Sequence, residues 1–275
     1  MFNILDPLVL YPLLGVIVAS IASATVGSIM VTRGITFLSA EVAHAALGGA
    51  ALSVLLQVKA GLVWFNPLLG AFLFGIISAL FTGYAGEKGF TGRMEAAIGV
   101  SLALSMALAV LFLSYIPSEY MPKVWGYLIG DILLLSVNDV LLLGMVSLGI
   151  AVLYAIFYRE FIYLAFDIEG AEAAGLNVRV YHYLSLILVA LGTVIITKAL
   201  GAILVYAFLI APAASASELT KNALKIPLIT FVTSLTFGIV GLMLTFIMNI
   251  PASGVIGLLA AIFYLFIMLS KIRKG

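Results

Sequence analysis

Apolar residues fill most of the 275 positions of this chain, in long runs interrupted only by short polar or glycine-containing segments. About 20 such residues are needed for a helix to cross a bilayer, and the runs reach that length repeatedly. The pattern predicts spans near residues 9–31, 38–57, 66–85, 93–116, 138–158, 181–198, 200–217, 228–248 and 254–271. We therefore expect an all-α polytopic membrane protein with about eight or nine transmembrane helices in one domain, residues 1–275.

One apolar segment on the predicted outer side does not fit this scheme. Val124–Ser136 is too short to cross a bilayer, so we interpret it as a re-entrant or interfacial helix. Asp131 lies within it and could line an outer vestibule or cap a helical turn.

The longest polar stretch, about residues 159–180, has the pattern of a short helix between two spans. Asp167 suits the N-cap, and Glu169 and Glu172 favour the positive N-terminal end of a helix. Gly175 and Asn177 suit its termination. Such a helix could insert into a groove on a cytoplasmic partner, although a solvated connecting loop would also explain the stretch.

The basic residues predict the orientation, because loops rich in Lys and Arg remain in the cytoplasm. With the N-terminus outside, most of the basic residues fall on the cytoplasmic side. The cytoplasmic side then holds Arg33, Lys88, Arg93, Arg159, Arg179, Lys221, Lys225, Lys271, Arg273 and Lys274, against Lys59, Lys123 and Lys198 outside.

Composition excludes several classes of function. The chain is 64% hydrophobic and 9% charged, with a net charge of +1, which argues against nucleic-acid binding. It has no cysteine, so disulfides, zinc-thiolate sites and thiol chemistry are excluded. The sequence also lacks a Gly-x-x-x-x-Gly-Lys-Ser/Thr phosphate loop, so we expect a transport subunit without an ATPase site of its own.

The main chemical candidates are Glu41 and His44, which lie inside an apolar predicted span. Ionisable groups in hydrocarbon usually face an interior or a water-filled path. Three positions apart on a helix, these two share a face. Imidazole nitrogen and carboxylate oxygen are ligands for divalent first-row metals, whereas the alternative roles are a hydrogen bond to a neighbouring helix and a headgroup contact.

Three stretches resemble the membrane permeases of ATP-binding-cassette importers for zinc, manganese and related metals. They are Val31–Ser39 with Ala43–Leu52, then Phe166–Val178, then Gly201–Ala216, which contains Pro-Ala-Ala; Ala97–Gly99 adds a weaker match. Their order and the overall length extend the resemblance over nearly the whole chain.

The resemblance implies a homodimer in the prokaryotic cytoplasmic membrane that moves zinc, manganese or iron inward by alternating access. Two separate ATPase subunits would grip the two coupling helices, and an extracellular or periplasmic binding protein would deliver the metal ion. The metal is cargo, and no permanently bound cofactor is implied. The coupling residues would be Asp167, Glu169, Ala171, Glu172, Ala173, Ala174 and Gly175.

The chain departs from the family pattern at one position of its metal motif. Many members carry an aspartate four residues before the histidine, where this chain has Ala40. The acid here is Glu41, about 100° further around the helix. The candidate metal residues are therefore His44, Glu41 and Asp131, and the choice of metal stays open.

Two other kinds of transporter remain as alternatives. A permease for a chelated metal, such as a siderophore or cobalamin, would share the architecture but need a wider path. A secondary transporter would show inverted repeats and charges near the membrane midplane, and the sequence has no convincing internal repeat.

Overall fold

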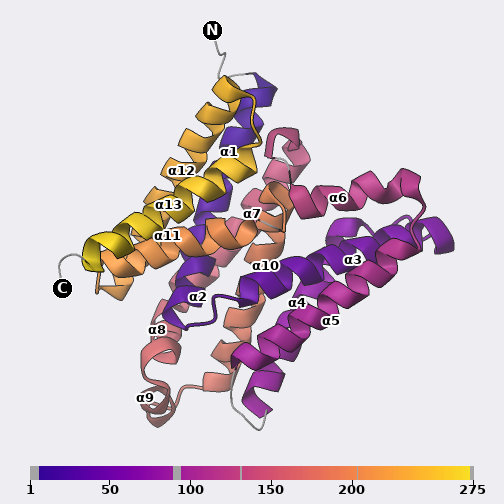
Figure 1. Ribbon diagram of the computed structural model, residues 1–275. Helices are drawn as coiled ribbons and strands as arrows, with labels where there is room; N and C mark the ends of the chain where they lie inside the picture. The colour runs from indigo at the N-terminus through magenta and orange to yellow at the C-terminus, as the bar shows by residue number, and fades with distance from the viewer. Residues whose placement is uncertain (1–5, 89–93, 131, 203, 273–275) are drawn as a thin grey trace.

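The computed structural model describes residues 6–88, 94–130, 132–202 and 204–272, and its regular elements there are helices (Figure 1). The elements are α1 Pro7–Ala22, η1 Ser23–Gly27, α2 Ser28–Thr32, α3 Leu38–Ala60, α4 Pro67–Lys88, α5 Met94–Ser114, η2 Ser118–Tyr120, α6 Met121–Ile129, η3 Ile132–Leu134, α7 Val137–Ile156, α8 Tyr158–Phe166, α9 Ile168–Ala173, α10 Val178–Leu200, α11 Val205–Leu219, η4 Ala223–Lys225, α12 Ile226–Met248 and α13 Ala252–Ile272.

Eight helical segments within the described ranges are long and apolar enough to cross a membrane. The first combines α1, η1 and α2 into Pro7–Thr32, and the others contain α3, α4, α5, α7, α10, α12 and α13. The predicted span near 200–217 corresponds to α11, which has 15 residues and starts later, at Val205. The expected all-α polytopic architecture is confirmed.

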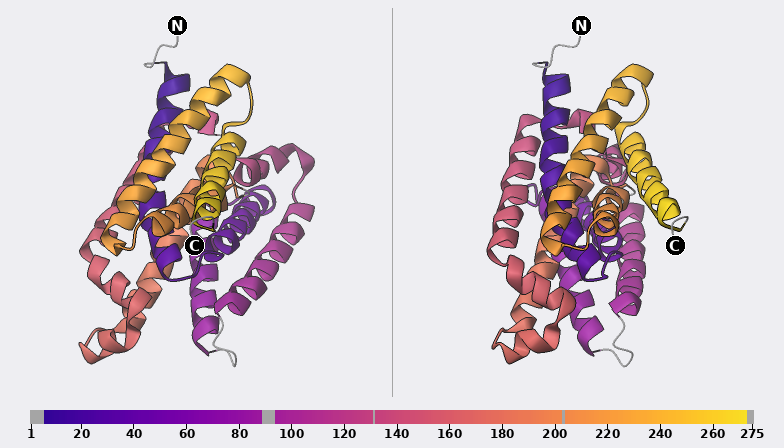
Figure 2. Two further views of the ribbon diagram at one scale, coloured as in Figure 1. Left: turned by 60° about the vertical axis from the view of Figure 1, so that its left-hand side comes forward. Right: turned by 90° about the vertical axis from the view of Figure 1, so that its left-hand side faces the viewer.

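The helices form two groups that meet at α10 (Figures 1 and 2). α3 packs against α4 and α5 on one side, while α11, α12 and α13 pack together on the other. α10 contacts α3 and α4 as well as α7 and α11. In all views α9 lies at the end of the molecule opposite the N-terminus.

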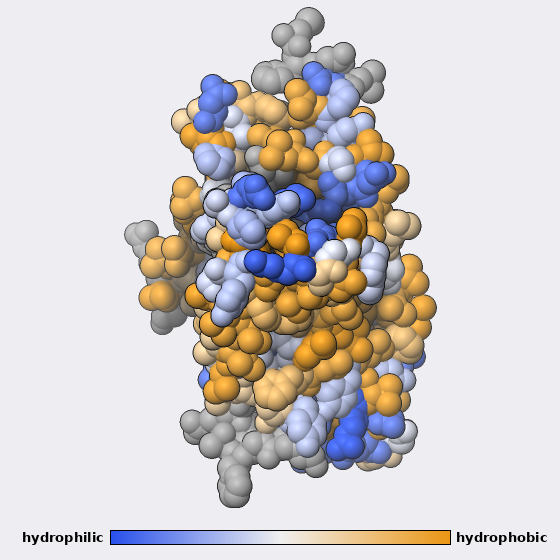
Figure 3. Space-filling model, turned by 90° about the vertical axis from the view of Figure 1, so that its right-hand side faces the viewer, coloured by the Kyte–Doolittle hydropathy of each residue, from blue (hydrophilic) through white to orange (hydrophobic). Residues whose placement is uncertain are grey.

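α5 shows why this arrangement suits a membrane. Its buried face carries the small residues Ser101, Ser105 and Ala109, whereas Val100 and Leu104 are more than half exposed. Small residues let helices approach closely, and large apolar residues match lipid. Figure 3 shows the resulting hydrophobic belt on this side, bounded by polar residues toward both ends.

α3 and α4 approach most closely at two glycines. A Cβ on Gly49 would collide with the carbonyl of Gly70, and a Cβ on Gly70 would collide with Ser53 Oγ and the Gly49 carbonyl. The backbones can therefore lie side by side only because both residues lack a side chain. This contact helps to set the position of the helix that carries Glu41 and His44.

Three local predictions need adjustment. The predicted short helix is α6, which begins at Met121, before Val124, and is followed by the separate turn η3. The cytoplasmic stretch contains an additional helix, α8, that the sequence pattern did not predict. Asn177 does not end α9: its Oδ1 accepts from the amide of Val180 and so caps the start of α10. Asparagine suits both kinds of cap, which explains the error.

Two irregular helices meet where η1 packs against α11. Pro212 lies inside α11 and has no amide hydrogen to donate to the carbonyl of Phe208. Ser23, in the π-helical turn η1, donates its hydroxyl to that carbonyl at 2.9 Å. A Cβ on Gly27 would collide with the carbonyl of Leu209, so glycine permits the approach. The proline-induced defect in one helix is thus satisfied by another helix.

We expect Ser23→Ala to lower the free energy of unfolding by about 1 to 3 kcal/mol, because it leaves the buried Phe208 carbonyl unpaired. Unfolding in detergent, followed by circular dichroism, would measure this change. In a Pro212→Ala background the restored backbone amide can pair with Phe208, so the same substitution should have a much smaller effect there. Equal effects in both backgrounds would contradict this account.

Candidate functional site

Glu41 lies in the first turn of α3 and is completely buried. Its Oε1 atom accepts hydrogen bonds from Thr82 at 2.9 Å and Ser101 at 2.7 Å, and a third from Ser78. These donors come from α4 and α5, so the carboxyl group joins three helices. Oε2 has no hydrogen-bond partner within the described part of the chain. Glu41 therefore faces the interior of the α3–α5 group.

His44 lies one turn further along α3 but in a different environment. Its side chain is partly exposed, as is Ala40 one turn earlier. Nδ1 lies 2.8 Å from the carbonyl of Ala40. Because a carbonyl only accepts, Nδ1 must carry the proton, and the neutral ring then has a free lone pair on Nε2.

The structure places Glu41 and His44, two of the three predicted metal residues, in different surroundings. Glu41 is held among hydroxyl groups, whereas His44 lies on the partly exposed side of the same helix. Asp131 lies outside the described residues. Within the described ranges, no group of three His, Asp or Glu side chains could hold a metal ion.

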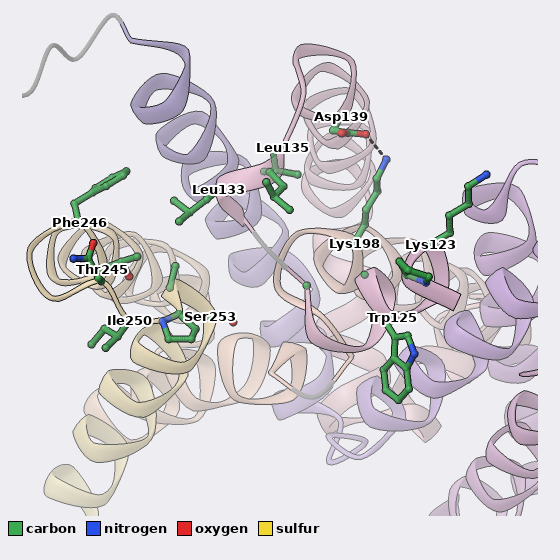
Figure 4. Close-up of a pocket in the computed structure, with 17 residues that line it drawn as sticks. Lys123, Trp125, Leu133, Leu135, Asp139, Lys198, Thr245, Phe246, Ile250 and Ser253 are labelled. Atoms are coloured by element: carbon green, nitrogen blue, oxygen red, sulfur yellow. Dashed lines mark hydrogen bonds and ion pairs between the residues drawn. The ribbon is translucent and has the colours of Figure 1, made fainter. Parts of the chain in front are cut away.

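A cavity of about 920 Å³ lies on the predicted outer side, between α6, η3, α7, α10 and the α12–α13 turn (Figure 4). Asp139 and Lys198 form an ion pair at its edge. Asp139 also forms a capping box with Ser136 at the start of α7: Ser136 Oγ accepts from the Asp139 amide at 3.3 Å, and Asp139 Oδ2 accepts from the Ser136 amide at 3.1 Å. Lys123 adds a second ammonium group to the lining.

At the opposite end, α8 and α9 form the predicted cytoplasmic element. Asp167 caps α9 as expected, with Oδ1 accepting from the amide of Gly170 at 2.9 Å. Ala171 is buried, while Glu172, Ala173, Ala174 and Gly175 are exposed. Gly175 has φ +80°, a left-handed conformation that glycine adopts without strain.

The sequence did not reveal the partners of Glu41 or the pairing of Asp139 with Lys198. Ser101 belonged to a recognisable row of small residues, but Ser78 and Thr82 lie on another helix with no distinctive spacing to Glu41. Hydroxyl residues are common in apolar helices, so only the packing identifies these ones.

A profile of the ABC 3 transport family matches residues 6–271. The chain belongs to this family. The ABC 3 chain is 31% identical to the manganese transport system membrane protein MntC of Listeria innocua, over 94% of this chain and 89% of MntC. It is 27% identical to the manganese import system permease protein ScaB of Streptococcus parasanguinis, over 96% of this chain and 91% of ScaB.

A solved structure, PsaBC from Streptococcus pneumoniae in complex with Fab, matches the ABC 3 chain with a TM-score of 0.80 and 27% identity. The match covers 94% of this chain and 90% of that one. Together with the eight apolar helices, the family assignment makes the ABC 3 chain a multi-pass cell-membrane protein of the ABC-transporter permease type.

We expect Glu41→Ala to lower the free energy of unfolding by about 1 to 3 kcal/mol, because Ser78, Thr82 and Ser101 lose a shared buried acceptor. Glu41→Gln retains an acceptor oxygen and should cost less. Denaturation of the purified chain in detergent would compare them, with Glu95→Ala as a control because Glu95 is exposed. Equal stability of Glu41→Ala and Glu95→Ala would contradict the structural role of this cluster.

Proposed function

We propose that this chain is the permease subunit of an ATP-driven importer that moves a divalent first-row transition-metal ion, with manganese as the first candidate, into the cytoplasm. The chain resembles MntC and ScaB over most of its length, and by name the first is a manganese transport system membrane protein and the second a manganese import permease. Zinc and iron use the same ligand types and belong in the same test.

The contact of His44 Nδ1 with the carbonyl of Ala40 is the observation that carries this proposal. A histidine that binds a metal ion commonly donates its other ring hydrogen to a carbonyl or carboxylate, which fixes the ring and exposes the second nitrogen. Nδ1 of His44 has this contact with Ala40, and the small residues Gly48 and Gly49 follow on the same helix. We propose His44 Nε2 as a transit ligand, so that the ion is bound only briefly.

The other predicted ligands enter the proposal differently. Ala40 cannot supply the carboxylate that many relatives have at that position, and Glu41 Oε1 is already occupied by hydroxyl groups. Oε2 of Glu41 is the oxygen through which this residue could contribute. Asp131 would act earlier on the path, at the outer mouth.

Energy and substrate would come from other subunits. We propose a homodimer of this chain with two ATPase subunits and an external metal-binding protein, working by alternating access. α9 would be the coupling helix, because its exposed residues lie at the end of the molecule opposite the N-terminus. In a homodimer with the path on its two-fold axis, each His44 would have a symmetry mate facing the same ion.

Reconstituted complexes of the chain with its ATPase and binding protein should show ATP-dependent uptake of manganese. We expect His44→Ala to reduce the rate at least about tenfold, as expected when a metal-site contact is lost. Parallel assays with zinc and iron rank the ions, and Lys59→Ala, exposed at the end of α3, is the matched control. Undiminished uptake by His44→Ala would refute its role as a ligand, and uptake of a chelated metal alone would refute free-ion import.

Ala173→Trp tests the docking of α9. This residue is exposed and helical, so a bulky side chain there should block a groove without straining the backbone. Trp at Gly175 would instead strain the backbone, because Gly175 has a left-handed conformation. We expect a loss of metal-stimulated ATP hydrolysis with normal membrane insertion. Ala155→Trp, on the exposed side of α7, is the control. Full stimulation of hydrolysis in Ala173→Trp would contradict the docking assignment.

A further inference from the structure

Arg33 connects two parts of the bundle at the predicted cytoplasmic side. It ends α2, and Gly34 then turns the chain into the segment that leads to α3. One guanidinium nitrogen donates to Ser185 Oγ, and the other lies 2.6 Å from Nδ1 of His182. Both partners are on α10, and Ser185 Oγ donates in turn to the carbonyl of His182 at 2.7 Å.

The contact with Arg33 determines the tautomer of His182. A guanidinium can only donate, so Nδ1 of His182 accepts, and the proton of the neutral ring is on Nε2. That nitrogen lies 3.8 Å from Glu87 Oε1, at the end of α4. A ring with this protonation cannot offer Nε2 to a metal ion. The His182 ring can therefore accept a hydrogen bond from Arg33 at Nδ1 and donate one toward Glu87 from Nε2. His44 has the opposite tautomer.

Arg33 and His182 are within hydrogen-bond distance, whereas His182 and Glu87 are not. The separation of 3.8 Å between His182 Nε2 and Glu87 exceeds hydrogen-bond length, and Nε2 is buried without a partner in the described ranges. Glu87 is meanwhile approached by Tyr183 at 3.2 Å and by Arg179 at 3.9 Å, both on α10. A shift of about 1 Å would complete the bond.

His182 and Glu87 border a cavity of about 430 Å³ that also reaches α8 and α9. Arg33, Glu87 and His182 line it together with Leu164 of α8 and Ile168 of α9. Val178, at the start of α10, also contributes to the lining. Motion of α8 and α9 can therefore change the space in which the polar contacts lie.

The partial burial of a charged group argues that Arg33 is more than a packing residue. Desolvation lowers its pKa to about 10, so it remains charged at neutral pH. No carboxylate lies within ion-pair distance of it in the described residues. The ring of His182 contacts Arg33 through Nδ1 and approaches the Glu87 carboxylate through Nε2. An apolar side chain would fill this space without requiring such compensation.

We propose that Arg33, His182 and Glu87 form a polar latch that ties the cytoplasmic ends of α2 and α4 to α10, next to the segment that leads into α3. Movement of α8 and α9 then reaches α3, the helix that carries His44. This inference rests on the proposed function for its transport consequence, but the mechanical link can be tested separately. These three side chains are positioning residues and do not contact the metal ion.

Two substitutions of His182 separate the latch from simple packing. Glutamine can accept from Arg33 and donate toward Glu87, whereas leucine can do neither. In the reconstituted complex, we expect His182→Leu to reduce manganese uptake per ATP hydrolysed at least about fivefold, the lower range of allosteric coupling, and His182→Gln to stay within about twofold of wild type. Arg33→Lys should resemble the leucine variant, since lysine cannot reproduce both guanidinium contacts; Arg159→Lys, at an exposed position, is its control.

Distances measured by electron paramagnetic resonance test the link without relying on transport. The chain has no cysteine, so Phe37→Cys and Val180→Cys would place spin labels only at the exposed starts of α3 and α10. We expect their separation to stay constant on ATP addition in wild type and His182→Gln, and to change in His182→Leu. Thermal unfolding confirms that each variant is folded.

These outcomes distinguish the two proposals. If wild type imports no metal ion while the label distances behave as expected, the transport function fails and the latch stands. If His182→Leu matches wild type in both assays, or if glutamine and leucine are equally defective, the latch is refuted.

Discussion

Polar groups inside a membrane bundle can bond only to the protein itself, and this requirement determines the irregular parts of the chain. The carbonyl left unpaired by Pro212 is satisfied by Ser23 from another helix. Among the described residues Glu41 forms no ion pair, and hydroxyl groups from α4 and α5 hold its carboxyl group. Each solution joins separate helices, so satisfying polar groups also fixes the packing. The apolar surface, by contrast, faces lipid and needs little specificity.

The two histidines illustrate how a neighbour decides chemistry. His44 contacts a carbonyl through Nδ1, which leaves a lone pair on Nε2, whereas His182 contacts a guanidinium through Nδ1, which leaves a proton on Nε2. The first arrangement suits metal binding and the second suits hydrogen bonding to a carboxylate. Residue type alone could not separate these roles. The division agrees with a transport path near α3 and a mechanical contact near the start of α10.

Much of the fold could be predicted, because span length and cap chemistry depend on nearby residues. Eight of the nine predicted spans and the Asp167 cap are confirmed, and the ninth is the shorter helix α11. Asn177 was assigned to the wrong helix because either cap can use asparagine. The candidate site could be predicted only in part. Glu41 was conspicuous as a charge in an apolar run, but its partners Ser78 and Thr82 depend on how α3 and α4 pack. No local pattern records that pairing.

α10 extends from the contacts of His182 on the predicted cytoplasmic side to the ion pair of Lys198 at the cavity on the predicted outer side. Past its midpoint, Gly192 packs so closely that a Cβ there would collide with Val26 and touch Ile150. A rigid helix held near its middle can pivot at that point, so that its two ends move in opposite directions. One rigid helix could thus make the opening of one mouth and the closing of the other a single motion, without a signal passing between separate gates.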